Sequence, residues 1–194
     1  VWYGTTVATV SHSIKKLIMS FLERTADDPK AEIAFKLHDF GARGVSSAES
    51  AGLGGCAHLT NFMGSDTIEA LLFARKYYGE PMAAFSIPAM EHSTVTSWGK
   101  ANEARAYRNF VTQFGKPGSL IAAVSDSYDI YNAVEHIWGE ELKQQVQDSG
   151  ATIVVRPDSG DPPLIVLRTL QLLESKYGAT KNKKGYKVIN GMRV

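Results

Sequence analysis

The sequence lacks the features that would direct a protein to a membrane, a disulfide-bonded fold or a nucleic acid. No apolar run approaches the roughly 20 residues that a membrane span needs. Lysine plus arginine number 21 and aspartate plus glutamate 20, so the net charge of +1 attracts neither nucleic acid nor an anionic membrane. The single cysteine, Cys56, cannot form an internal disulfide and lies among small residues. We expect a buried thiol there rather than a nucleophile, and a cytoplasmic protein.

Several motifs of known chemistry are also absent. There is no Gly-x-Gly-x-x-Gly or Walker-type loop, which disfavours the nucleotide-binding folds built on them. The 5 histidines are dispersed, so no zinc-ligand cluster is predicted. The Ser-Asp-Ser at 125–127 and the Asp-Ser-Gly at 158–160 do not form a nucleophile elbow. The chain starts at Val1 without a signal peptide, and we expect it to be a piece of a longer protein.

What the sequence does contain is a repeated order of apolar strand, polar loop and helix. This alternation predicts an α/β protein with a parallel sheet, and the short strands favour part of a (β/α)-barrel-like unit, incomplete within this chain. We expect a single barrel-like domain over residues 1–194, with residues 1–30 as a strand and helix that lead in from a preceding domain. The expected strands cover residues 2–10, 32–38, 59–62, 82–87, 119–124, 152–155 and 186–189. The expected helices cover residues 11–24, 46–58, a segment ending at 78, 94–114, 129–146 and 161–178.

Three helix starts carry capping signals. Ser46 with Glu49 and Asp66 with Glu69 have the spacing of a capping box. Asp161 stands before Pro162, which suits the first position of a helix.

Charged or aromatic side chains follow nearly every expected strand. In a barrel the loops at the carboxyl ends of the strands converge on one face, so these residues would surround one pocket. Each also has a local alternative: Asp66 and Asp126 as helix caps, Arg43 in a solvated turn, His92 as a satisfied loop histidine, and Arg156 paired with Asp158. The candidate residues are Asp39, Phe40, Arg43, Asp66, Glu91, His92, Asp126, Arg156 and Asp158.

This set of residue types suits an anionic substrate. Arginine binds phosphate through two parallel hydrogen bonds, which lysine does not reproduce. Carboxylates hold ribose hydroxyls or coordinate Mg²⁺ that bridges phosphates. The residues therefore predict a pocket for a sugar phosphate or diphosphate, with no metal ligand assigned to the protein itself.

Four runs of sequence, taken together and in order, closely resemble the nicotinamide phosphoribosyltransferases. The resemblance covers almost the whole chain, which matches the central segment of that family. It implies an irregular α/β barrel of the type II phosphoribosyltransferase kind and a homodimer with the active site at the interface. It also implies that nicotinamide and 5-phosphoribosyl diphosphate give nicotinamide mononucleotide and diphosphate, in NAD salvage. The four runs are Lys36-Leu37-His38-Asp39-Phe40-Gly41 with Arg43-Gly44-Val45-Ser46-Ser47, Glu91-His92-Ser93-Thr94, Val124-Ser125-Asp126-Ser127-Tyr128-Asp129-Ile130-Tyr131, and Arg156-Pro157-Asp158-Ser159-Gly160.

The resemblance also implies a role for individual residues. Phe40 would stack on the pyridine ring, and Asp66 would accept a hydrogen bond from the carboxamide. Asp158 would hold the ribose hydroxyls, with Asp126 close to the same site. The cofactors implied are Mg²⁺ with the diphosphate and ATP as an optional coupling substrate that phosphorylates His92. The residues implied to contact phosphate or diphosphate are Arg43, His92 and Arg156.

Three other functions stay open on the sequence. A nicotinate phosphoribosyltransferase is the nearest in chemistry, but a carboxylate at Asp66 would repel the carboxylate of nicotinate. A non-catalytic binding or dimerising fragment that kept the fold is the second. An unrelated barrel enzyme acting on sugar phosphates is the third, and it predicts no response to pyridines.

Overall fold

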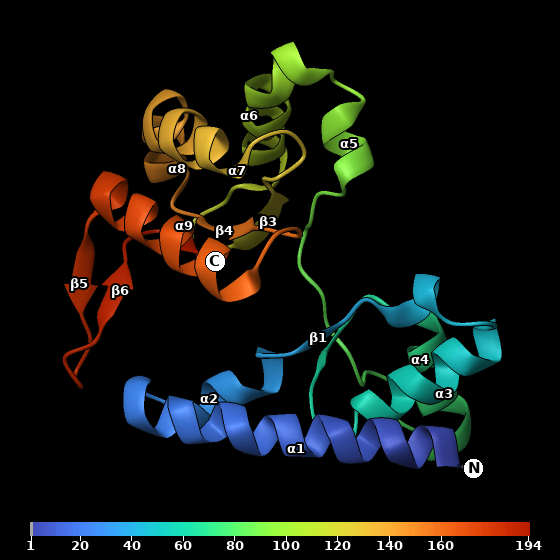
Figure 1. The fold of residues 1–194 in the computed structure, drawn as a ribbon. Helices are drawn as coiled ribbons and strands as arrows, with labels where there is room; N and C mark the ends of the chain where they lie inside the picture. The colour runs from blue at the N-terminus through green and yellow to red at the C-terminus, as the bar shows by residue number, and fades with distance from the viewer. Residues whose placement is uncertain (1) are drawn as a thin grey trace. The chain divides into compact units, whose positions relative to one another are not determined.

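Short parallel strands that follow one another in chain order recur through the structure, a computed structural model that describes residues 2–194 (Figure 1). The expected mixed α/β class with parallel strands is confirmed. The chain divides into two compact units, unit 1 with residues 1–86 and 182–186, and unit 2 with residues 87–181 and 187–194. The expectation of one barrel-like domain over residues 1–194 stays a prediction. Within the described residues, no helix combines the length and apolarity that crossing a membrane requires.

Unit 1 opens on a long helix where a strand was expected over residues 2–10, and that expectation is wrong. The threonines there favour strands by propensity, but their hydroxyls bond to carbonyls within the helix: Thr5 Oγ1 donates to Trp2 O at 2.8 Å and Thr9 Oγ1 to Thr5 O at 2.8 Å. The less exposed positions recur at helical spacing along the same element, ending at the buried Leu22. Tertiary burial therefore overrides β propensity. The helices and strands of unit 1 are α1 (Trp2–Thr25), α2 (Pro29–Glu32), η1 (Ile33–Phe35), β1 (His38–Asp39), η2 (Gly41–Gly44), α3 (Ala48–His58), β2 (Gly64–Ser65) and α4 (Ile68–Tyr78).

The strands of unit 1 are shorter than the sequence predicts. Residues 32–38 are mostly helical turns, because Asp28 caps a helix that starts at Pro29 and continues into η1. Residues 59–62 form the turn after α3 instead of a strand, and β2 comes later. The strand expected over 82–87 is reduced to a bridge between Phe85 and Gly64, since Pro81 and Pro88 at its ends lack a backbone N–H. The parallel order in unit 1 is thus β1, β2, Phe85.

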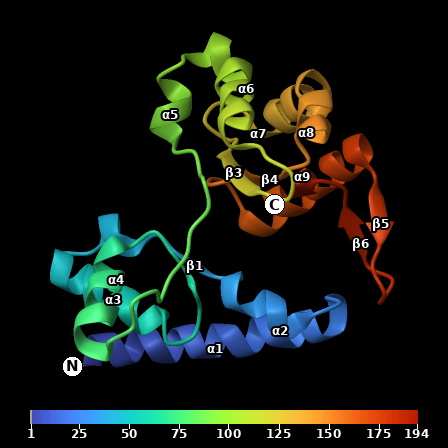
Figure 2. The ribbon, with the colours of Figure 1, turned by 180° about the vertical axis from the view of Figure 1, so that it is seen from behind.

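Helices α3 and α4 lie side by side in both views (Figures 1 and 2). A Cβ at Gly52 would lie 2.4 Å from the Phe73 ring, and one at Gly55 would lie 2.6 Å from Ala70 Cβ. The glycines of α3, which weaken helix propensity, are what allow this close approach.

Two capping predictions in unit 1 are wrong by one residue. The side chain of Ser47, rather than Ser46, accepts the Ser50 N–H at 3.0 Å and caps α3. Thr67, rather than Asp66, occupies the N-cap position of α4 and makes no side-chain cap bond. The spacing rule finds the turn, but local backbone geometry selects the residue.

Unit 2 contains the larger hydrophobic core, built on a parallel sheet. Strand β3 pairs with β4 over five residues, from Leu120 opposite Thr152 to Val124 opposite Arg156, and β4 pairs with β7. Ala89 bridges to Ala122 on the other edge of β3, so the parallel order follows the chain. The elements of unit 2 are α5 (His92–Thr96), η3 (Lys100–Asn102), α6 (Glu103–Phe114), β3 (Leu120–Val124), α7 (Ile130–Asn132), the π-helix η4 (Ala133–Glu141), α8 (Lys143–Ser149), β4 (Thr152–Arg156), α9 (Pro162–Tyr177), β5 (Ala179–Lys181), β6 (Lys187–Ile189) and β7 (Met192–Arg193).

Several predictions in unit 2 are confirmed. The strands expected over 119–124 and 152–155 are β3 and β4, and the strand expected over 186–189 is β6, which pairs antiparallel with β5. Helix α9 begins as expected, with Asp161 accepting the Leu164 N–H at 3.1 Å and Pro162 at its first position.

Two long helices were expected in unit 2 and both are interrupted. The helix expected over 94–114 is divided into α5, η3 and α6, because Gly99 takes a positive φ of 76° between them. The helix expected over 129–146 is divided into α7, η4 and α8. Its middle part is a π-helix that contains the buried Trp138.

Candidate active site

In unit 1, the predicted site residues lie at the carboxyl ends of two neighbouring parallel strands. Asp39 is the last residue of β1, and Asp66 directly follows β2. The Asp66 N–H donates to the Asp39 carbonyl at 2.9 Å, which continues the parallel pairing beyond the strands. Phe40 and Asp66 therefore start from adjacent points, as the sequence predicts for loops at the carboxyl ends of parallel strands.

The carboxylate of Asp66 is held by side chains rather than by a helix N-terminus. His38 Nε2 lies 3.1 Å from Asp66 Oδ1, and the hydroxyl of Ser86 donates to the same oxygen. The Asp66 side chain is 38% exposed, so it remains accessible to a ligand. The alternative in which Asp66 is only a helix cap is thus wrong, because Thr67 takes that position.

Phe40 presents an accessible aromatic ring. It is 48% exposed, and its ring centre lies 4.5 Å from that of His38 at a tilt of 32°. Arg43 lies in the short helix η2 that follows, and it is exposed. A ring that is half exposed and supported from one side suits stacking on a flat ligand better than a place in the core.

Asp39 has a structural part in this loop. Its Oδ1 accepts the Gly41 N–H at 2.7 Å, and its Oδ2 accepts the Ser65 hydroxyl at 3.4 Å. The carboxylate therefore links the loop after β1 to the end of β2 and supports the positions of Phe40 and Asp66.

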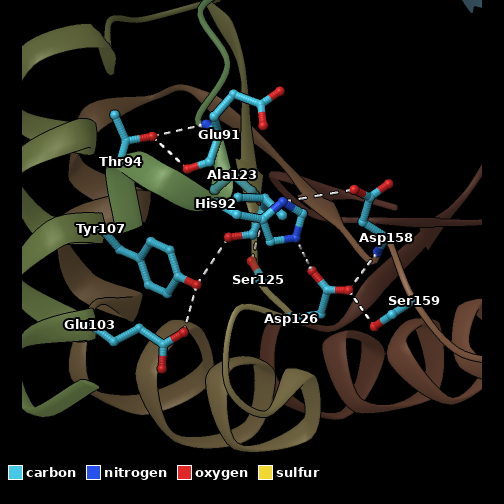
Figure 3. Close-up of polar contacts among 11 residues, drawn as sticks. Glu91, His92, Thr94, Glu103, Tyr107, Ala123, Ser125, Asp126, Asp158 and Ser159 are labelled. Carbon is cyan, nitrogen blue, oxygen red and sulfur yellow. Dashed lines mark hydrogen bonds and ion pairs between the residues drawn. The ribbon is translucent and has the colours of Figure 1, made fainter. Parts of the chain in front are cut away.

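In unit 2, His92, Asp126 and Asp158 come together, each from a loop or helix start at the end of a parallel segment (Figure 3). His92 is the first residue of α5, and its Nε2 lies 3.1 Å from Asp126 Oδ1. On the other side of the ring, His92 Nδ1 lies 3.8 Å from Asp158 Oδ2. The imidazole thus lies between two carboxylates, and the shorter contact, to Asp126, fixes its orientation.

Asp126 is the organising carboxylate of this cluster, with only 5% of its side chain exposed. Its Oδ2 accepts the Asp158 N–H at 2.9 Å and the Ser159 hydroxyl at 2.5 Å. Burial acts to raise the pKa of Asp126, but the hydrogen bonds from Ser159, the Asp158 backbone and His92 outweigh it and lower that pKa. Asp126 is therefore a carboxylate that orients its neighbours rather than a proton donor.

The alternative in which Asp126 caps the following helix is wrong. The cap of α7 is Asp129, which accepts the N–H groups of Tyr131 and Asn132 at 2.9 and 3.1 Å. Arg156 ends β4 with its side chain partly buried, and its carbonyl accepts the Ser125 N–H at 3.0 Å. Both residues therefore stand at the carboxyl edge of the sheet.

Three residues of these clusters had no role in the sequence prediction. His38 and Ser86 hold Asp66, and Ser159 holds Asp126. Ser159 lies next to a candidate residue, and His38 ends a predicted strand, so position along the chain could have suggested both. Ser86 could not be found this way, because it meets Asp66 from 20 residues away.

Between residues 2 and 194, no three histidine, cysteine, aspartate or glutamate side chains are grouped as a metal would require. Exposed oxygen ligands for Mg²⁺ are nevertheless present, because 55% of the Asp158 side chain is exposed.

Comparison with known proteins finds a matching family model and several relatives that share one name. The model described as the nicotinate phosphoribosyltransferase (NAPRTase) family matches residues 35–190. A protein named nicotinamide phosphoribosyltransferase from Xanthomonas campestris pv. campestris (strain 8004) is 58% identical over 194 residues, which are 100% of this chain and 42% of that protein.

Two more distant relatives carry the same name. The Acinetobacter baylyi protein is 29% identical over 97% of this chain and 41% of its own length. The Mycoplasma pneumoniae protein is 32% identical over 98% of this chain and 42% of its own length. The chain thus spans about two fifths of the length of the curated relatives it matches.

Proposed function

The chain belongs to the nicotinate phosphoribosyltransferase family, and from this premise we propose that its protein transfers the phosphoribosyl group of 5-phosphoribosyl diphosphate to nicotinamide. The products are nicotinamide mononucleotide and diphosphate, a step of NAD salvage. The choice of nicotinamide over nicotinate rests on the accessible Asp66 carboxylate directly after β2. A carboxylate accepts a hydrogen bond from the NH₂ of nicotinamide and repels the carboxylate of nicotinate.

We assign pyridine binding to residues of unit 1. The half-exposed ring of Phe40 stacks on the pyridine, and Asp66, held by His38 and Ser86, accepts from its carboxamide. Stacking and this bond together hold the ring nitrogen in line for attack on the ribose carbon. The pyridine nitrogen carries no proton, so this attack needs no general base.

We assign phosphate and ribose binding to charged residues that lie at the carboxyl ends of strands, considered in each unit by itself. Breaking the bond from ribose C1 to diphosphate leaves positive charge on the sugar and adds negative charge to the leaving group. Within unit 2, Arg156 and His92 stabilise phosphate and diphosphate oxygens, and Asp158 holds the ribose hydroxyls. Within unit 1, the exposed Arg43 is assigned to phosphate. Asp126 keeps His92 oriented through the 3.1 Å contact. Mg²⁺ arriving with the diphosphate fits the exposed oxygens of Asp158, and when bound it neutralises charge on the leaving group.

The family also supports proposals about the larger assembly. We propose that these short parallel strands, whose order in each unit follows the chain, belong to an irregular (β/α) barrel of the type II phosphoribosyltransferase kind. We propose a cytoplasmic homodimer with the active site at its interface. The rival readings are a nicotinate enzyme, a non-catalytic fragment and a sugar-phosphate enzyme of another kind.

A coupled assay on the full-length protein tests the function. We expect nicotinamide mononucleotide from nicotinamide and phosphoribosyl diphosphate with Mg²⁺, and little product from nicotinate. A preference for nicotinate would favour the first rival, and a response to neither pyridine would favour the other two.

We further propose that ATP phosphorylates His92 and thereby couples hydrolysis to synthesis. A phosphoryl group on the ring nitrogen would exploit an imidazole already oriented by Asp126. Full-length protein incubated with ATP should carry an acid-labile phosphate on His92. His92→Ala should lose stimulation by ATP while some basal synthesis remains, and a phosphate found on another residue with His92 unmodified would reject this role.

A further inference from the structure

A buried polar network lies beside the His92–Asp126 cluster in unit 2, to its left in Figure 3. Tyr107 on α6 is fully buried, and its hydroxyl oxygen lies 2.9 Å from Glu103 Oε1 and 3.0 Å from the Val124 carbonyl. Glu103, one turn earlier on the helix, is only 4% exposed. Val124 is the last residue of β3, two positions before Asp126.

With Glu103 ionised, this network has too few protons to give each acceptor a donor. If Glu103 were ionised, the single O–H of Tyr107 would face two acceptors, and one of them would stay without a donor in a buried place. If Glu103 is protonated, its O–H donates to Tyr107, and the Tyr107 O–H donates to the Val124 carbonyl. Both hydroxyls and the Val124 carbonyl are then satisfied by a chain of two hydrogen bonds.

The ionisable groups around Glu103 are of both signs. Burial raises the pKa of Glu103, Tyr107 and Lys100 act to lower it, and Asp129 acts to raise it, with the net direction upward. Burial and the neighbouring Glu103 also raise the pKa of Tyr107, so the phenol keeps its proton. The charged and titratable side chains that line the open cavity of about 510 Å³ beside Glu103 are Lys100, Tyr128, Asp129, His136 and Glu141.

A second contact fixes the same strand end. Trp138 Nε1 donates to Ser125 Oγ at 3.1 Å, and Ser125 Oγ donates to the Ala123 carbonyl at 3.0 Å. The rings of Tyr107 and Trp138 stack with their centres 4.7 Å apart. Val124, the last residue of β3, and Ser125, which follows it, are therefore held from two helices at once, α6 and η4.

We propose that Tyr107 and a protonated Glu103 form a positioning pair that fixes the carboxyl end of β3 and thereby places Asp126 against His92. Neither residue touches the substrate in this assignment. The pair acts through the backbone of Val124 and Ser125 on the carboxylate that orients His92. The inference rests on the proposed phosphoribosyl transfer and adds two residues to its machinery.

The first test replaces the Tyr107 hydroxyl and uses Tyr177 as a matched control. Tyr177 is also a buried tyrosine whose hydroxyl donates to a backbone carbonyl, that of Trp138 at 2.6 Å. It reaches the end of β3 only indirectly, through Trp138, whereas Tyr107 bonds to the Val124 carbonyl itself. Tyr107→Phe should lower kcat about tenfold, the scale of a small displacement at a reacting centre, with KM for nicotinamide changed less than about twofold. Tyr177→Phe should lose a comparable amount of stability and keep kcat. Equal effects of the two variants on kcat would overturn the proposal.

The second test asks whether Glu103 acts as an acid. The NH₂ group of Glu103→Gln can donate to Tyr107 as the protonated carboxyl does, so this variant should keep kcat close to that of the wild type, whereas Glu103→Leu should fall as Tyr107→Phe does. The infrared band of a protonated carboxyl should be present in the wild type at neutral pH and absent from Glu103→Gln. If the Gln and Leu variants are equally impaired, or if the wild type lacks this band, the proposal that Glu103 is protonated is overturned.

A further readout separates this inference from the proposed function. A wild type without transferase activity would reject the function alone. The NMR signal of the His92 ring should still shift in Tyr107→Phe and stay in place in Tyr177→Phe. A His92 signal that is unchanged in Tyr107→Phe would reject the positioning role regardless of activity.

Discussion

At the scale of the residue, the proposed function makes Asp66 the group that distinguishes nicotinamide from nicotinate. Its carboxylate is accessible and is held by His38 and Ser86. Asp66→Asn removes the negative charge and adds an NH₂ donor that can meet the carboxylate of nicotinate. We expect the preference between the two pyridines to move toward nicotinate by roughly 1–3 kcal/mol, the scale of a hydrogen bond to a charged group.

The measurement is the ratio of kcat/KM for nicotinamide and nicotinate in the wild type and in Asp66→Asn. Stability should change little, because Asp66 does not cap α4. Thr67→Ser, at the N-cap position of that helix, serves as a control that should leave the ratio unchanged. A ratio that is the same in all three proteins would contradict the assignment of Asp66.

Glu103 and Asp126 should give opposite dependences of stability on pH. The pKa of Glu103 is raised from its ordinary 4.5, so the folded state binds more protons than the unfolded state above that pH. Stability from Glu103 is therefore present below about pH 4.5 and is lost as the pH rises through the folded-state pKa. Asp126 has a lowered pKa, so its stability is present above its ordinary 3.8 and is lost as the pH falls below that value.

Urea unfolding over a pH series checks both signs. Relative to the wild type, Glu103→Gln should become more stable as the pH rises above about 4.5. The difference in stability between Asp126→Asn and the wild type should disappear as the pH falls below about 3.8. Parallel pH profiles of wild type and Glu103→Gln would contradict a protonated Glu103.

At the scale of the element, the glycines of α3 matter for packing rather than for flexibility. A Cβ at Gly55 would lie 2.6 Å from Ala70 Cβ and 3.0 Å from Asp39 Oδ2, so α4 and the loop after β1 would have to move. We expect Gly55→Ala to cost about 1–3 kcal/mol by overpacking, although alanine favours a helix. The matched control is Gly4→Ala in α1, where nothing lies within 4 Å and alanine should stabilise by about 0.5–1 kcal/mol.

Thermal or denaturant unfolding of the two variants decides this point. The two substitutions are chemically the same, so opposite signs of the change can come only from what surrounds each glycine. Stabilisation in both would mean that α3 and α4 can separate without loss.

At the scale of the whole molecule, the two units differ in how much core they contain. Among the described residues, the largest fully buried side chains lie in unit 2, with the exception of Phe62. The core of unit 1 around Phe62 is a small cluster with Leu22, Ala26 and Ile33. Local opening is easiest where few apolar contacts are broken.

Native-state hydrogen exchange should therefore protect the amides of β3 and β4 more strongly than those of β1 and β2. The Ile121 and Ile153 amides, fully buried and paired with each other in β3 and β4, are expected among the slowest. Equal protection in both units would show that they open as one cooperative unit.

The sequence by itself determined the parts of this protein that depend on neighbouring residues. β3, β4 and the start of α9 at Asp161 and Pro162 were predictable, because a short apolar run and a capping signal act locally. The placement of Asp66, His92, Asp126 and Asp158 after parallel segments, and of Asp39 at the end of one, was predictable for the same reason. The family resemblance on these motifs is confirmed by the comparisons.

Only the tertiary structure decided what depends on burial and on contacts far along the chain. Residues 2–10 are helical because one face is covered, in spite of threonines that favour strands. Asp66 is held by His38 and Ser86 instead of capping a helix, and His92 meets Asp126 across 34 residues. The protonation of Glu103 likewise follows from one buried hydroxyl placed between two acceptors, a count of protons that no local pattern contains.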